Sequence, residues 1–172
     1  MVLKRFLLPL CGVLLLSGCL DFSGFTMSGK SSLTKDVQIT SISVDKSARR
    51  MYLLSDNTII RSYRIGLGFT PNGHKSLSGD GKTPEGLYYI DQKNPNSKFY
   101  MSLGISFPYA QERAYAQSMG ASAGGDIFIH GQNKKPRFWK RDWTEGCIAV
   151  KDHEIQEIYA LVPIGTPILI TP

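Results

Sequence analysis

Residues 127–131 read Ile-Phe-Ile-His-Gly and residues 143–150 read Trp-Thr-Glu-Gly-Cys-Ile-Ala-Val, and these two stretches form the most informative pattern of the chain. The apolar run before His130 predicts a strand whose end holds the imidazole on rigid backbone. Gly146 predicts a tight turn that presents the thiol of Cys147. Because an imidazole next to a thiol can take its proton, we predict Cys147 as a nucleophile and His130 as its general base.

The turn at Gly146 predicts one more part of this site, since successive backbone N–H groups there can receive an oxyanion. A second interpretation stays open. In it, Cys147 is a small buried residue beside Ile148 and Val150, and His130 is a core histidine bonded to backbone. The two interpretations differ in reactivity, because a buried structural thiol reacts slowly.

Residues 1–18 predict a signal peptide. Lys4 and Arg5 form a positive region ahead of an eleven-residue apolar run, residues 6–16, which is too short to span a bilayer. This segment contains the longest apolar run of the chain, so the sequence excludes a polytopic membrane protein.

The signal peptide ends in Leu-Ser-Gly-Cys at residues 16–19, which is similar to the bacterial lipobox, and we predict lipidation of Cys19. The residue after Cys19 is Leu20. An aspartate at this position would be similar to an inner-membrane retention signal, so the leucine favours the outer membrane. Cys11 would leave with the signal peptide, so Cys147 would be the single free thiol and would have no disulfide partner.

Residues 19–36 predict a lipidated N-terminus and a flexible linker, because serine and glycine are frequent there. As a random coil this linker would span roughly 23 Å and keep the folded part near a membrane. Residues 37–172 then form the single predicted domain, a size that suits one hydrophobic core.

Charge and composition exclude several classes of function. The net charge is +6, and it falls to +4 without Lys4 and Arg5, which suits an anionic partner but does not indicate nucleic-acid binding. Three cysteines are too few for a disulfide scaffold. The three histidines have no ligand-like spacing, so we predict no metal and no cofactor.

Short apolar stretches with few helical patterns predict a mainly β domain with a few short helices. The predicted strands are 37–44, 51–54, 59–65, 87–90, 101–105, 127–129 and 167–170, with a hairpin turn at 55–57 and a long loop over 71–86. The predicted helices are 111–119 and one that Asp152 caps and that carries Ile155, Ile158, Tyr159 and Val162.

Residues 79–88 read Gly-Asp-Gly-Lys-Thr-Pro-Glu-Gly-Leu-Tyr. With the two stretches around His130 and Cys147, they make the chain resemble the L,D-transpeptidases, the family with the YkuD-type catalytic domain, from about residue 49 to 172. The resemblance implies a β-sandwich-like catalytic domain that acts on peptidoglycan stem peptides, at the carbonyl of an L-centre joined to a D-residue. It also implies that Thr144 helps to orient the base.

Two positions depart from the pattern of many family members, which have histidine at the position of Glu145 and arginine at the position of Ala149. Glu145 would raise the pKa of the Cys147 thiol slightly by its negative charge. The departures resemble a divergent branch that also contains enzymes cutting the bond between peptidoglycan and its attached lipoprotein.

A basic run with interleaved aromatic residues, residues 134–141, lies between the two motifs. It predicts either a loop that meets stem-peptide carboxylates or a solvated charged loop with its aromatic residues in the core. We predict Trp143, Gly131 and Arg141 as substrate-binding residues. Because a positive run repels a protonated amine, it favours water slightly as the group that resolves the acyl-enzyme.

The sequence therefore predicts a lipid-anchored, peptidoglycan-modifying cysteine enzyme at the periplasmic face of the cell envelope. Transpeptidation through an acyl-enzyme at Cys147 is the activity that the resemblance implies. Two alternatives stay open: a hydrolase of the same class that releases peptidoglycan-linked lipoprotein, and a lipoprotein that only binds peptidoglycan. The predicted partners are stem peptides, that lipoprotein and the membrane, and not nucleic acid.

Cys19→Ala should block lipidation, because the thiol that carries the acyl chains is removed. The protein should then leave the membrane fraction, and the N-terminal peptide should carry no acyl mass. Cell fractionation with mass spectrometry of that peptide checks this, with wild type as the control. Equal membrane retention of both proteins, without acyl mass on wild type, would contradict the lipobox.

Overall fold

A computed structural model describes residues 37–133 and 141–172. The predictions for the signal peptide, Cys19, the linker and the basic residues 134–140 lie outside this part of the chain. The described strands are β1 (Ser41–Asp45), β2 (Arg50–Ser55), β3 (Thr58–Arg64), β4 (Gly86–Ser97), β5 (Tyr100–Ile105), β6 (Phe128–His130), β7 (Ile148–Ala149) and β8 (Pro167–Thr171). The described helices are α1 (Ala110–Ser118) and α2 (Asp152–Leu161).

The mainly β fold with short helices is confirmed, and most predicted elements lie within a few residues of the observed ones. β4 is much longer than its predicted stretch, residues 87–90, because its polar second half pairs with β5 and needs no apolar pattern. β7 was not predicted, since it has only two residues. Among the described residues, no helix is long and apolar enough to cross a membrane.

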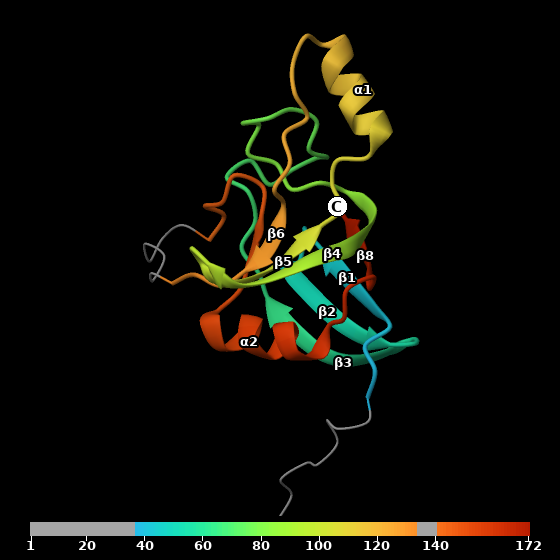
Figure 1. Ribbon diagram of the computed structural model, residues 1–172, viewed down its shortest axis with the longest axis vertical. Coiled ribbons are helices and arrows are strands. Elements are labelled where there is room, and N and C mark those ends of the chain that lie inside the picture. Colours follow the sequence, from blue (N-terminus) through green and yellow to red (C-terminus); the bar gives the residue numbers. More distant parts are fainter. Residues whose placement is uncertain (1–36, 134–140) are drawn as a thin grey trace, which may run out of the picture. The chain divides into compact units, whose positions relative to one another are not determined.

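The strands form one sheet in the order β3-β2-β1-β8-β4-β5-β6-β7 (Figure 1). Most neighbours are antiparallel, but β1 pairs parallel to β8, and β6 pairs parallel to β7. β4 belongs to both halves, since it pairs with β8 at its start and with β5 further along. The register shifts in β4 between Ile90 and Gln92, a bulge of the kind that bends a strand from one half of a sheet to the other.

The two ends of this sheet meet through the segment that follows β3. Gly66 exchanges both backbone hydrogen bonds with Ala149 of β7, at 2.8 and 2.9 Å. Two residues on, Gly68 forms a bridge to Thr144. The sheet therefore curves back on itself, in agreement with the predicted β-sandwich-like domain, and its seam runs beside Cys147.

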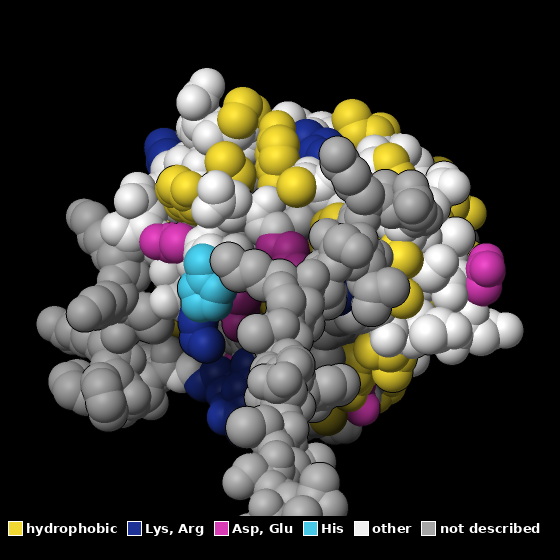
Figure 2. All heavy atoms as spheres, turned by 90° about the horizontal axis from the view of Figure 1, so that it is seen from below, with side chains coloured by type: hydrophobic (Ala, Val, Ile, Leu, Met, Phe, Trp, Pro, Cys, Tyr) yellow, Lys and Arg dark blue, Asp and Glu magenta, His cyan; other side chains and the backbone are white. Residues whose placement is uncertain are grey.

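The core fills the space inside the curved sheet, because alternate strand residues point to that side. β1 contributes Ile42 and Val44, and β2 contributes Met51 and Leu53, all of which are buried. Other fully buried residues include Leu67, Tyr88, Leu103, Ile129, Ile148, Ile155, Ile158 and Ile168. On the face shown in Figure 2, acidic and basic side chains are interspersed, and hydrophobic side chains also reach the surface.

α2 lies against the sheet, whereas α1 stands away from it at the opposite end of the domain (Figure 1). Glu112 of α1 accepts the hydrogen bond of the Tyr88 hydroxyl at 3.1 Å, which ties this helix to β4. α2 packs on β5 and β6 through Ile155 and Ile158. The prediction that Asp152 caps α2 is wrong: Lys151 is the N-cap, and its N–H donates to the carboxylate of Glu154 at 2.9 Å.

Two ion pairs hold the loops around the seam. The fully buried ammonium of Lys46 donates to Glu85 at 2.7 Å and to the carbonyls of Gly73 and Thr83 at 2.7 and 3.0 Å. Arg49 donates to Asp142 at 2.9 Å, and the same carboxylate accepts the Leu67 N–H at 3.0 Å. A buried charge is tolerated when it is paired and fully hydrogen-bonded, so these pairs fix loop positions.

Candidate active site

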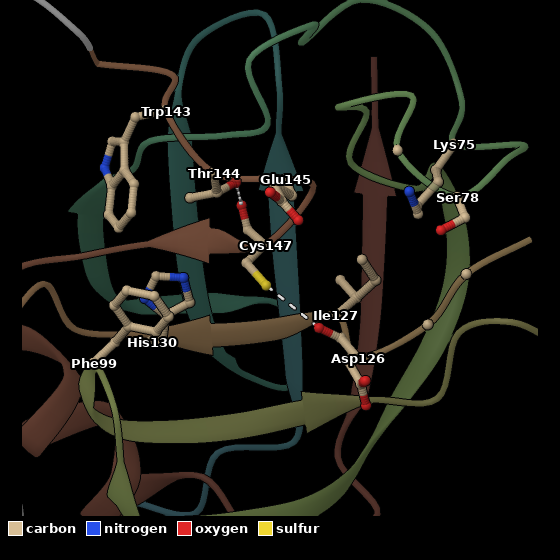
Figure 3. A pocket seen from close by; sticks show the side chains of 13 residues that line it. Lys75, Ser78, Phe99, Asp126, Ile127, His130, Trp143, Thr144, Glu145 and Cys147 are labelled. Carbon is tan, nitrogen blue, oxygen red and sulfur yellow. Dashed lines mark hydrogen bonds between the residues drawn. The ribbon is translucent and has the colours of Figure 1, made fainter.

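A pocket of about 690 Å³ lies at the seam, with Cys147 in its middle (Figure 3). On one side of the thiol, Figure 3 shows Phe99, His130 and Trp143; on the other it shows Lys75, Ser78 and Asp126. The pocket is lined by Lys75, Ser78, Gly79, Phe99, Gly124, Gly125, Asp126, Ile127, His130, Trp143, Thr144, Glu145 and Cys147. It thus has an aromatic side and a polar side.

His130 ends β6, as predicted, and stands opposite Ala149 in the parallel pair with β7. Because side chains on one face of a strand recur every second residue, Cys147 faces the same side as Ala149 and therefore as His130. The imidazole is only 2% exposed, and its Nδ1 donates to the Gly131 carbonyl at 2.5 Å. That bond assigns the proton to Nδ1 and leaves Nε2 with a free lone pair. Figure 3 shows one ring nitrogen turned toward Cys147.

The surroundings of Cys147 and His130 disfavour the charged form of each group. Burial lowers the pKa of His130, and the hydrogen bond to Gly131 offsets this only in part. Burial also raises the pKa of the Cys147 thiol. A backbone hydrogen bond from Phe128 and the positive charge of Lys75 offset this in part, whereas the negative charges of Asp126 and Glu145 add to it. The thiol donates to the Asp126 carbonyl at 3.4 Å. An imidazole that takes the proton during reaction therefore fits this site better than a permanent thiolate.

The side-chain hydroxyl of Thr144 stabilises the turn before Cys147. This hydroxyl donates to the Cys147 carbonyl at 2.7 Å and accepts the Gly146 N–H at 3.2 Å. Gly146 has φ 136°, and a Cβ there would lie 2.6 Å from the Lys82 carbonyl, so only glycine fits. Thr144 thus orients the turn, and its implied role in orienting His130 stays a prediction.

The structure reduces the number of backbone N–H groups that are available for the predicted oxyanion site. The Gly146 N–H is already bonded to Thr144 and cannot receive an oxyanion without breaking that bond. The Cys147 N–H has no hydrogen-bond acceptor among the described residues. We therefore infer that the Cys147 N–H is the backbone donor for a developing oxyanion.

The polar side is built from the loop that carries residues 79–88. The Asp80 carboxylate accepts the backbone N–H groups of Ser76 and Leu77 and binds the buried ammonium of Lys75 at 2.9 Å. Burial alone would raise the pKa of Asp80, but these hydrogen bonds lower it to about 2. Thr83 of the same stretch accepts the Gly68 N–H at 3.2 Å, which attaches the loop to the seam.

Residues 39–170 match the family model described as the L,D-transpeptidase catalytic domain. The chain belongs to the L,D-transpeptidase family. It is similar to YafK of Escherichia coli K12, with 33% identity over 113 residues, which are 64% of this chain and 38% of YafK. It is similar to YqjB of Bacillus subtilis, with 27% identity over 132 residues, which are 74% of this chain and 69% of YqjB.

A solved structure agrees with the fold of this L,D-transpeptidase domain. The helical cell shape determining protein Pgp2 of Campylobacter jejuni aligns with a TM-score of 0.59 and 23% identity, over 78% of this chain and 48% of the Pgp2 chain. This chain thus spans about half of Pgp2 and 38% of YafK. The predicted family and its single catalytic domain fold are confirmed.

Not all predicted site residues of the L,D-transpeptidase domain line the pocket. Trp143 does, together with Cys147 and His130. Arg141 is exposed and does not. Gly131 does not either; its carbonyl holds His130 instead.

The other two histidines lie outside the pocket. His153 is exposed in the first turn of α2, as its sequence position indicates. His74 is half-buried, and its Nδ1 accepts the Glu85 N–H at 3.1 Å. In residues 37–133 and 141–172, no three His, Cys, Asp or Glu side chains gather as a metal site would require.

Sequence reasoning missed Phe99, Asp126 and Lys75 as pocket residues. Asp126 carries a signal in retrospect, since it follows two glycines and adopts φ 55°, a conformation that aspartate tolerates better than most residues. The sequence gives no such signal for Phe99, because this residue lies at a hairpin tip about thirty residues before His130.

Alkylation of Cys147 by iodoacetamide should accelerate with pH along a curve whose midpoint lies above that of a free cysteine. The reason is that burial raises the pKa of this thiol and only the thiolate reacts. Labelling rates between about pH 6 and pH 10, read by mass spectrometry, check this. Cys147→Ala corrects for other thiols, and a midpoint below that of free cysteine would reveal a resting thiolate instead.

Thr144→Val should loosen the catalytic turn, because valine keeps the shape but loses both hydrogen bonds of the hydroxyl. We expect the free energy of unfolding to fall by about 1–3 kcal/mol, from the unsatisfied Gly146 N–H and Cys147 carbonyl. Urea unfolding measures it, with Thr144→Ser as the matched control that should keep both bonds. Equal stability of all three proteins would refute this role of Thr144.

Proposed function

We propose that this chain is a peptidoglycan L,D-transpeptidase that acts through an acyl-enzyme at Cys147. The observation that carries the proposal is the single pocket in which the thiol, a neutral imidazole and a free backbone N–H meet. Membership of the L,D-transpeptidase family supports the substrate class, a peptidoglycan stem peptide. The reaction then follows from what each group can do.

Acylation begins when the carbonyl of the L-centre approaches the thiol. Nε2 of His130 takes the thiol proton while sulfur bonds to the carbonyl carbon, and the Cys147 N–H receives the oxyanion. When the intermediate collapses, the bond to the leaving D-residue breaks, and His130 gives its proton to that amine. A thioester on Cys147 and a neutral imidazole remain.

Deacylation repeats these steps with a new nucleophile. An acceptor amine attacks the thioester carbon, His130 takes a proton from the attacking nitrogen, and the thiolate leaves and regains a proton. Water in place of the amine would give hydrolysis by the same route. The acceptor must approach from the side of His130, because the same base serves the leaving and the entering amine.

The described charges of the pocket favour an amine as acceptor. Asp126 and Glu145 are both exposed at its rim, whereas the ammonium of Lys75 is buried and paired with Asp80. Neither carboxylate forms an ion pair within residues 37–133 and 141–172, and two such negative charges attract a cationic amine. Most of the basic run that favours water, residues 134–140, lies outside the described part of the chain, so hydrolysis is an outcome of the test below.

We also propose that the enzyme is tethered to the periplasmic face of the outer membrane by a lipid on Cys19. The support is the similarity of residues 16–19 to the lipobox and the serine- and glycine-rich stretch that follows. A tethered domain meets peptidoglycan at a high effective concentration, because the linker limits its distance from the membrane. The fractionation of Cys19→Ala tests this proposal.

Wild type should exchange D-methionine into the fourth position of tetrapeptide muropeptides, and Cys147→Ala should lose this exchange entirely because no acyl-enzyme can form. Mass spectrometry of the muropeptides measures the product, and circular dichroism checks that the variant is folded. Glu145→Gln should raise the KM for the amine without changing hydrolysis, since it removes one rim charge. Asp91→Asn, at an exposed carboxylate on β4 that does not line the pocket, is its control.

Three results would contradict the proposal. Full exchange by Cys147→Ala would refute the nucleophile. Release of lipoprotein from peptidoglycan by wild type, without D-methionine exchange, would replace the transpeptidase with the hydrolase. Binding of peptidoglycan without any turnover would leave a non-enzymatic lipoprotein.

A further inference from the structure

The catalytic histidine is held between two aromatic side chains that the proposed steps do not use. The ring of Phe99 stacks on His130, with centroids 4.5 Å apart and planes at 26°. Trp143 meets the same imidazole edge-on, with centroids 5.8 Å apart and planes at 71°. Figure 3 shows the Phe99 ring against the imidazole, on the side of the pocket opposite Asp126.

The hairpin tip that carries Phe99 is fixed in place by its neighbours. Asn133 donates a side-chain N–H to the Lys98 carbonyl at 2.9 Å. A Cβ on Gly131 would lie 2.7 Å from the Phe99 carbonyl, so glycine allows the tip to lie close to the end of β6. Tyr100, the next residue, has φ 82°, a conformation that non-glycine residues adopt only when their surroundings impose it.

The support for this tip extends to α2. The Asp152 carboxylate accepts the N–H groups of Gln132 and Asn133 at 2.7 and 3.2 Å. Those two residues follow Gly131, and Asn133 is the residue that holds Lys98. A continuous set of contacts therefore leads from the first turn of α2 to the ring of Phe99.

Stacking against a flat ring restricts a rotation of the imidazole that the single hydrogen bond of His130 leaves free. The bond from Nδ1 to the Gly131 carbonyl fixes one direction of the ring but permits rotation about that direction. In many catalytic triads a carboxylate orients the base, but no carboxylate in the described ranges forms an ion pair with His130. A flat apolar face fixes the plane of the ring and also keeps water from it.

We propose that Phe99 is a positioning residue for the proposed reaction: its ring fixes the plane of the His130 imidazole, so that Nε2 faces the thiol. This inference rests on the proposed function for its effect on rate, but its effect on the imidazole does not depend on any substrate. Phe99 itself touches neither the reacting sulfur nor the carbonyl carbon in the proposed steps.

The titratable groups near His130 define what a pH measurement reports. Cys147 and Glu145 face it from the turn before β7, and Asp152 lies beyond Gly131 on α2. Lys75, paired with Asp80, and Asp126 stand across the pocket. None of these charges changes when Phe99 is replaced, so a change in the titration of His130 reports the loss of the stack.

The experiment compares three variants of the full chain with wild type. Phe99→Ala removes the ring, Phe99→Tyr keeps an aromatic face, and Tyr89→Ala is the matched control. Phe99 is 39% and Tyr89 45% exposed, but Tyr89 lies on β4 outside the pocket. Long-range proton–nitrogen NMR spectra of the isotope-labelled protein give the tautomer and pKa of His130, and D-methionine exchange gives kcat and KM.

In Phe99→Ala we expect the pKa of His130 to rise toward its ordinary value, because water reaches the ring. The signal of the Nδ1-protonated tautomer should weaken, and kcat should fall by about tenfold to hundredfold with KM almost unchanged. Phe99→Tyr and Tyr89→Ala should behave as wild type. The split between kcat and KM separates positioning from loss of substrate binding.

An unchanged His130 titration and tautomer in Phe99→Ala would overturn the inference, as would an equal fall of kcat in Tyr89→Ala. If Phe99→Ala does not fold, Phe99→Leu takes its place, and wild-type kcat in that variant would also overturn the inference. Altered titration without turnover in any protein, wild type included, would support the stack and refute the proposed function. The two failures are thus distinguishable.

Discussion

The closure of the sheet is the constraint on which the site depends. Gly66 and Gly68 place a strand-like segment between the turn at Gly146 and the loop at Gly81, where side chains have no room. A Cβ on Gly68 would lie 2.1 Å from the Gly81 carbonyl, and one on Gly66 would lie 2.4 Å from the Arg141 carbonyl. The backbone pairing of Gly66 with Ala149 then fixes the residues that follow Cys147.

The parallel pairing of β6 with β7 positions the thiol and the imidazole of the pocket. Once β7 is anchored, its register with β6 puts His130 opposite Ala149, and the alternation of side chains brings Cys147 to the same face. His130 is then buried and Cys147 half-buried, which disfavours their charged forms. The fold thus brings a thiol and an imidazole to one pocket in surroundings that favour their neutral forms.

Most of the fold was predictable because its signals are local. The hairpin of β2 and β3 follows from two apolar runs around Asp56, and β8 follows from the last apolar run of the chain. The long polar half of β4 was not predictable, since its pairing with β5 depends on a partner strand and not on its own pattern. The cap of α2 was misassigned because Asp152, a typical capping residue, binds the backbone of Gln132 and Asn133 instead.

The sequence alone was enough to assign the family and to name Cys147 and His130 as the candidate nucleophile and base, because a lone cysteine after glycine and a histidine at a strand end are read from residue types and order. Only the tertiary structure decided what surrounds them. Phe99, Asp126 and Lys75 reach the pocket from three separate segments, and Arg141, close to Cys147 in sequence, does not reach it. The physical reason is that register and chain closure set these contacts, and both depend on pairing between strands far apart in the chain.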